Sequence, residues 1–127
     1  MCPDAPGTGT GAVDGMLHAV LHARLVIHRF EVDGVDIPVR FATLVAVARA
    51  ETEQIDWEVV ADCVQPVTRE LGRCSVEMLC ITGATEAGHL TLGELSGEAV
   101  VVRFMDRTLV LRGDGPLAGL SLDLLQG

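Results

Sequence analysis

The sequence contains no lysine and no tyrosine, and its aromatic residues are limited to three phenylalanines and one tryptophan. A phosphate-binding loop needs a lysine, so we interpret the glycine-containing stretches 83–88 and 113–115 as turns. The shortage of aromatic and phenolic side chains leaves few groups that could orient a ligand inside the protein. All nine basic residues are arginine, which we interpret as codon bias of a GC-rich genome.

Charge and the length of the apolar runs limit the possible partners. The formal net charge is −9 at pH 7, whereas a nucleic-acid-binding protein needs a basic surface that displaces the counterions of the phosphates. The apolar runs are far shorter than the ~18 residues of a membrane span. Residues 1–15 lack the basic and apolar regions of a secretory signal. We therefore expect a cytoplasmic protein without a nucleic-acid or membrane partner.

The cysteines are few and none form a CxxC pair, which argues against a thiol-rich zinc site and a redox dithiol. They are Cys2, Cys63, Cys74 and Cys80. The last three fall on the apolar faces of expected strands, where a free thiol behaves as a small hydrophobic group. Arg73 beside Cys74 is too weak a setting for a catalytic thiolate. No catalytic residue, metal or cofactor is predicted.

The most informative stretch is 24–47, in which two alternating apolar runs meet at Asp33-Gly34. Both central residues of a type I′ turn need a positive φ, which aspartate and glycine tolerate, so the pattern predicts a β-hairpin. In the first run we assign Val26, Phe30 and Val32 to the core face. This choice places His28 inward or at the rim of the fold.

The second run alternates in the same way, and Pro38 is expected at an edge or at a position without a ladder hydrogen bond. The residues assigned inward are Val35, Ile37, Val39, Phe41, Val45 and Val47, and those assigned outward in the far half are Ala42, Leu44 and Ala46. The far half is therefore apolar on both faces. Either the Leu120, Leu122 and Leu124 face of the terminal strand or a neighbouring subunit covers its outward face, and we expect the subunit. On this assignment, Leu44→Asp should dissociate an oligomer and Val45→Asp should unfold the chain.

Further alternating runs continue to the end of the chain. They predict strands at 55–64, 73–82, 89–92, 96–104, 108–112 and 120–125, with turns at 83–88, 105–107 and 114–116. Trp57 is expected to anchor the core. About eight short strands without a convincing long helix predict an all-β fold, a single antiparallel meander that forms a small barrel or a sandwich. We prefer the barrel because closure removes exposed strand edges.

The domain organisation follows from where this pattern lies in the chain. Residues 1–15 are expected to form a flexible arm, and residues 16–127 a single domain.

Two polar groups suggest metal binding but lack the necessary pattern. His18 and His22 share a face only in a helix, and the strand expected at 22–32 separates them from His28. The alternate carboxylates of the run 55–64 suit a solvated strand face better than the compact oxygen cluster of a calcium site.

Two classes of function remain. The first is a non-catalytic assembly or protein-interaction module, a small acidic β-domain that forms a homo-oligomer or joins a larger complex. The second is a small-molecule-binding β-barrel, either a binding protein or an enzyme, in which an apolar ligand occupies an internal cavity lined by His28, Trp57 and Met78. The first is favoured, because the sequence contains no catalytic motif and few side chains that orient a ligand.

Overall fold

The computed structural model describes residues 20–49, 55–66, 71–121 and 124–125, and in this part of the chain the regular structure is β-strand. The strands are β1 (Val20–Val32), β2 (Val35–Asp36), β3 (Val39–Arg49), β4 (Ile55–Cys63), β5 (Gly72–Ala84), β6 (Leu90–Met105) and β7 (Thr108–Ala118). The expected arm at 1–15, together with Cys2 and His18, lies outside the described residues.

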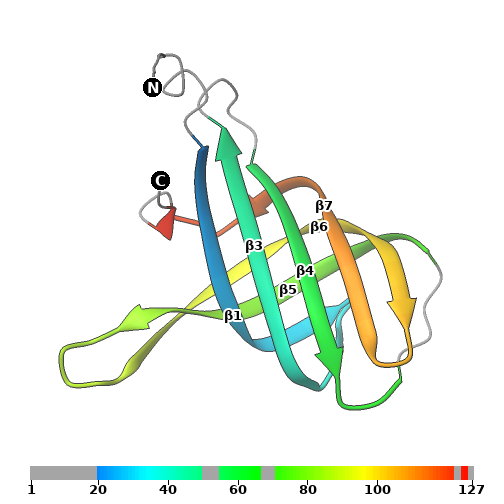
Figure 1. The fold of residues 1–127 in the computed structure, drawn as a ribbon, viewed down its shortest axis with the longest axis horizontal. Coiled ribbons are helices and arrows are strands. Elements are labelled where there is room, and N and C mark those ends of the chain that lie inside the picture. The colour runs from blue at the N-terminus through cyan, green and yellow to red at the C-terminus, as the bar shows by residue number, and fades with distance from the viewer. Residues whose placement is uncertain (1–19, 50–54, 67–70, 122–123, 126–127) are drawn as a thin grey trace, which may run out of the picture.

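The strands form one closed antiparallel barrel, which confirms the all-β prediction and decides between barrel and sandwich (Figure 1). The order β1-β3-β4-β7-β6-β5 closes on itself because β5 also pairs with β1, and the short β2 extends the sheet beside β1. Two meanders, β1-β3-β4 and β5-β6-β7, thus meet at the β4–β7 and β1–β5 seams. No helix in the described part of the chain is long and apolar enough to cross a membrane.

The predicted turn at Asp33-Gly34 is present. Their φ angles are 52° and 80°, as a type I′ turn requires, and Val32 pairs with Val35. The Asp33 carboxylate accepts a hydrogen bond from the backbone N–H of Ser75, at 2.8 Å, and the Asp33 N–H donates to the Ser75 carbonyl at 2.8 Å. The turn is therefore also fixed to β5.

A β-bulge at His28 changes the inward face of β1. Relative to β5, the register shifts between Ile27 and Arg29. Ile27 is buried before the bulge, and Phe30 and Val32 are buried after it. The prediction was right for Phe30 and Val32 but wrong for Val26, which is 39% exposed. His28, expected inward or at the rim, is exposed. The reason is that the extra residue of a bulge shifts the alternation of side chains.

A second bulge, at Arg40 in β3, reverses the predicted faces of residues 41–47. The assignment there was wrong: the buried residues are Ala42, Leu44 and Ala46, each 0% exposed, whereas Phe41 is 55% exposed. Val45 and Val47 point outward and are half-buried. Val35 was also misplaced, since it is 61% exposed. Ile37 is buried and Val39 partly buried, as predicted.

The reversal follows from the width of the barrel. A closed barrel of so few strands has a narrow interior, and small side chains occupy many of its inward positions. Among the inward residues with 0% exposure are Ala42, Ala46, Ala61 and Ala99. Placing the larger residues of β3 inward, as the sequence analysis did, would overfill this space.

The C-terminal half has fewer and longer strands than predicted. The separate strands expected at 89–92 and 96–104 form one continuous strand, β6. The turn expected at 114–116 is a bulge within β7, because Gly97 pairs with Leu117 and Ala99 with Gly113. In the expected eighth strand, described residues 120–121 and 124–125 are not in a strand. The hairpin between β6 and β7 is confirmed, with Met105 paired with Thr108.

Trp57 is buried at 3% exposure and anchors the core, as predicted. Its indole Nε1–H donates a hydrogen bond to the carbonyl of Gly115, at 2.9 Å. Gly97 and Gly113 pack against the indole ring, where a Cβ atom on either would clash with it. The bulge in β7 thus supplies the acceptor that a buried indole N–H needs.

Candidate functional site

The three residues predicted to line a ligand cavity do not lie together. Trp57 and Met78 are both buried in the core, each at 3% exposure. His28 lies exposed on the outside of the barrel, at the β1 bulge. A single internal cavity therefore does not bring the three side chains together.

The three cysteines of the described residues are buried and carry thiols rather than disulfides. Burial raises the pKa of the Cys80 thiol to about 11. Burial, and secondly the negative charge of Asp62, raise the pKa of Cys63. Both thiols are therefore protonated at neutral pH, which is the opposite of what a nucleophilic cysteine requires.

The histidines of β1 lie on its outer side. His22 and His28 are exposed. Within the described ranges, no group of three His, Cys, Asp or Glu side chains is placed to hold a metal ion.

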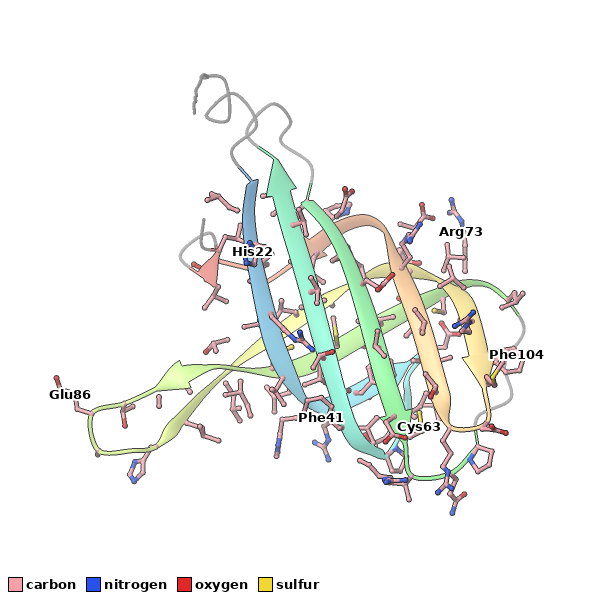
Figure 2. All side chains as sticks on the ribbon, viewed as in Figure 1. His22, Phe41, Cys63, Arg73, Glu86 and Phe104 are labelled. Carbon is pink, nitrogen blue, oxygen red and sulfur yellow. The ribbon has the colours of Figure 1, made fainter. Side chains whose placement is uncertain are left out.

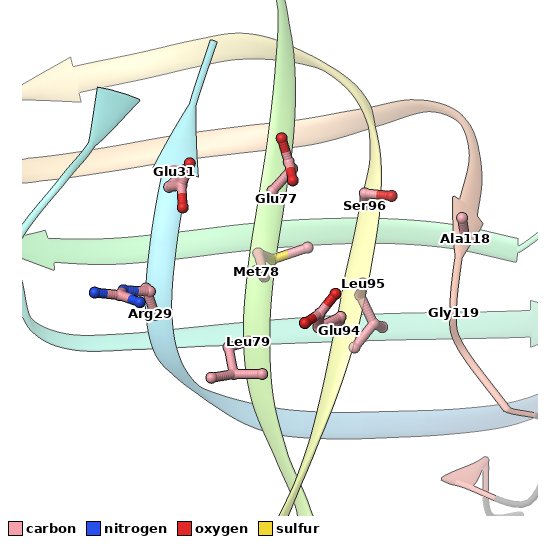
Figure 3. Close-up of a pocket in the computed structure, with 10 residues that line it drawn as sticks. All are labelled: Arg29, Glu31, Glu77, Met78, Leu79, Glu94, Leu95, Ser96, Ala118 and Gly119. Carbon is pink, nitrogen blue, oxygen red and sulfur yellow. The ribbon is translucent and has the colours of Figure 1, made fainter. Parts of the chain in front are cut away.

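A hollow of about 320 Å³ is lined by residues of β1, β5 and β6, among them the buried Met78 and Leu95, and by Ala118 and Gly119 (Figure 3). Three carboxylates from these neighbouring strands line it, Glu31, Glu77 and Glu94, together with Arg29. Glu77 and Glu94 are exposed, and Glu31 is half-buried. The hollow is therefore an acidic, solvated surface without a buried acid or base for catalysis.

A more distinctive surface is the outer wall formed by β1, β3 and β4, which lie side by side in Figure 1. Along β3 this wall presents an apolar stripe, which we call the β3 stripe: Phe41, Thr43, Val45 and Val47. Thr43 is only 8% exposed, although the alternation of β3 turns it outward. Figure 2 shows Phe41 near the end of the wall opposite to His22.

The flanking residues are aligned with the β3 stripe in three rows of cross-strand partners. The rows, each from β1 through β3 to β4, are His22–Val47–Asp56, Arg24–Val45–Glu58 and Val26–Thr43–Val60. In the first two rows the β1 residue has a nitrogen donor, the β3 residue is a valine and the β4 residue is a carboxylate. The third row consists of two valines and a threonine. We call these residues together with Phe41 the β1–β3–β4 face.

The charges of this face are separated by strand. On β1 the outward residues include the cationic Arg24 and the imidazole of His22, and on β4 the outward residues Asp56, Glu58 and Asp62 are acidic. Asp62 lies 3.8 Å from Arg40 of β3, in a solvated ion pair. Glu58 also lies 3.7 Å from Arg112 of β7, in an ion pair whose side chains are 42% and 70% exposed. Such a solvated pair holds its partners weakly, so Glu58 remains able to interact with another molecule.

A second candidate surface is a groove beside β1. The β5–β6 hairpin extends beyond the barrel (Figure 1), and Val26–Ile81 is the last pair that joins β1 to β5. Beyond this pair the strands diverge around a groove of about 760 Å³, lined in part by Leu25 and Leu90. Leu90 is 62% exposed. Among the described residues, no strand pairs with this edge of β1 before Val26, and an open strand edge permits strand addition by a partner.

The ordered charges of the β1–β3–β4 face were not predicted from the sequence. The carboxylates of 55–64 were assigned to a solvated strand face, and the histidines of β1 were considered separately from them. The available signal was the alternate spacing of His22 and Arg24 in one strand and of Asp56 and Glu58 in another. That signal becomes interpretable only with the register, which aligns both pairs with Val47 and Val45.

Comparisons of the chain with protein-family models, with curated proteins and with solved structures find no match.

Proposed function

We propose that the chain is a non-catalytic protein-interaction domain that takes part in forming an assembly. It binds its partner through the β1–β3–β4 face. The observation that carries this proposal is the β3 stripe. It places outward-facing apolar side chains along one strand, including Phe41 at 55% exposure.

Phe41 is one of only four aromatic side chains in this chain, and it is exposed to solvent instead of contributing to the core. Contiguous apolar surface rimmed by charged residues is typical of a protein interface, in which aromatic residues are enriched. The rim here consists of the charged residues of β1 and β4. A partner that covers the β3 stripe would remove this apolar area from water.

The alternative, a small-molecule-binding barrel, has less support. Trp57 fills the space beside Gly97 and Gly113, and His28 faces outward. Buried cysteines that carry thiols rather than disulfides suit a reducing compartment, so we place the domain in the cytoplasm as part of this proposal.

Site-specific photo-crosslinking in cells that express the protein tests the proposal. A photoreactive phenylalanine analogue replaces Phe41, and a matched control carries it at Met105, which is 64% exposed on β6. The expected result is a crosslinked adduct of defined mass from position 41 and none from position 105. Absence of an adduct at 41, or an equal yield at both positions, would overturn the proposal.

A further inference from the structure

We infer that the partner of the β1–β3–β4 face is a second copy of the same chain, related to the first by a two-fold axis parallel to β3. The inference rests on the proposed function and names its partner. It follows from the order of charges across the face rather than from the apolar stripe alone.

Rotation about an axis parallel to β3 exchanges the sides of the face but keeps each row at its own height. The β1 strand of one copy then lies over the β4 strand of the other. Arg24 of each copy faces Glu58 of its mate, and His22 faces Asp56. Arg24 therefore meets the opposite charge of Glu58 twice in each dimer. The His22 imidazole faces the carboxylate of Asp56, to which it can donate a hydrogen bond.

The third row agrees with the same operation. Val26 of one copy faces Val60 of the other, and Thr43 lies over its own counterpart. Val26 and Val60 are 39% and 40% exposed in the single chain. The apolar row therefore meets an apolar row, with no charge left opposite a hydrophobic side chain.

The other simple arrangement is disfavoured. A two-fold axis perpendicular to β3, in the plane between the copies, places β1 over β1 and β4 over β4. The order of the rows is also reversed, so an axis that passes through Val45 places Arg24 over Arg24 and Glu58 over Glu58 of the mate. The same rotation places Asp56 over Val60 of the mate, a charge opposite a hydrophobic side chain. Like charges at an interface oppose association, so the charge order selects the parallel axis.

The curvature of the barrel suits the side chains on the face. A barrel wall bends away on both sides of its central strand, so two copies approach most closely along β3. The short Val45 side chain lies there, at the centre of its row. Arg24 and Glu58, which are long, stand on the flanks where the gap is wider and can span it.

The size of the face sets the expected strength. Six residue steps separate Phe41 from Val47, which corresponds to about 20 Å of strand, and three strands span about 14 Å. This is small beside the roughly 800 Å² per partner of a standard interface. We therefore expect a concentration-dependent dimer that dissociates in the micromolar range.

Charge reversal tests the pairing by sedimentation velocity of the full chain across micromolar concentrations in about 0.15 M salt. Arg24→Glu and Glu58→Arg should each raise the dimer dissociation constant about tenfold or more, because each places like charges in contact twice. The double variant Arg24→Glu/Glu58→Arg should return to within about threefold of the natural chain. Circular dichroism checks that each variant retains its β-structure.

Mixing the two single variants gives a further test. Each is expected to sediment as a monomer alone, whereas an equimolar mixture should form a heterodimer, since every reversed charge then meets an opposite charge. The controls are Arg107→Glu, in the β6–β7 turn, and Glu86→Arg, at the tip of the β5–β6 hairpin (Figure 2). They change the net charge equally and should leave the dissociation constant unchanged.

Several outcomes would overturn the inference. One is a natural chain that stays monomeric at the highest concentrations, and another is a double variant no better than the singles. A dimer lost with Leu90→Asp but insensitive to Glu58→Arg would assign self-association to the groove instead. If the chain is monomeric while position 41 still crosslinks to a different protein, the interaction function stands and only the second copy is rejected.

Discussion

The indole ring of Trp57 occupies the space that a side chain on Gly113 would need. A Cβ atom at Gly113 would meet the Cε2, Nε1 and Cδ1 atoms of the indole, all of which belong to its five-membered ring. The same ring is fixed by its hydrogen bond to Gly115. The core thus depends on a close fit between one large residue of β4 and a glycine of β7.

Gly113→Ala should therefore destabilise the fold by about 1–3 kcal/mol, the usual cost of an overpacked core. The extra cost should shrink in a Trp57→Phe background, because phenylalanine lacks the five-membered ring. Urea unfolding of the four chains of this cycle measures the effect. Equal costs of Gly113→Ala in both backgrounds would contradict the account of the packing.

Gly34→Val should lower the melting temperature, because Gly34 has a φ of 80° and a β-branched residue resists that conformation. Gly34→Asn is the matched control, since asparagine tolerates a positive φ. Thermal unfolding followed by circular dichroism compares the two. A valine variant as stable as the asparagine variant would argue against the turn.

Unfolding free energy should fall as the pH rises from about 9 to about 11. Burial raises the pKa of Cys80 to about 11 from an ordinary value of 9.0. In this window the unfolded chain releases the thiol proton while the folded chain retains it, so rising pH favours unfolding. The raised pKa of Cys63 acts in the same direction.

The pH dependence can be assigned to cysteine thiols more directly than in most proteins, because the chain has neither tyrosine nor lysine to titrate in the same range. Cys80→Ala should lower stability at every pH but reduce the slope between pH 9 and 11, as measured by urea unfolding. An unchanged slope would show that this thiol is not the group responsible.

Leu44→Asp should unfold the chain and Val45→Asp should leave it folded, the reverse of the outcome expected from the sequence alone. Leu44 is 0% exposed, and an unpaired charge there has no solvent or partner. Val45 points outward, so aspartate at this position meets water in the monomer. Far-ultraviolet circular dichroism distinguishes the pair, and a folded Leu44→Asp chain would contradict the observed facing.

Features with a local chemical signal could be predicted from the sequence. The pair Asp33-Gly34 predicts a type I′ turn, because few other residue pairs adopt two positive φ angles. The alternation around Trp57 locates its inward face without knowledge of any other strand. These signals were sufficient for the all-β class and the first hairpin.

Features set by distant pairing could not be predicted. The bulges at His28 and Arg40 have no sequence signature here, and each changes which side chains face the core. On β3 both faces are apolar, so the alternation fits either assignment and the narrow barrel interior decides. The ordered charges of the β1–β3–β4 face depend on the same register. The apolar far half of β3 could therefore be recognised from the sequence, whereas the charges aligned on either side of it could not.

The most direct test of the account joins two copies at the centre of the face. In a Cys2→Ser background, where the other three cysteines are buried, a chain carrying Val45→Cys is treated with a short bismaleimide and examined by mass spectrometry. We expect a covalent dimer, and a much lower yield when Glu58→Arg is added. A control with Val102→Cys, exposed on β6 across the barrel, should remain monomeric. No dimer from Val45→Cys, or an equal yield from Val102→Cys, would contradict the claim that this face joins two copies.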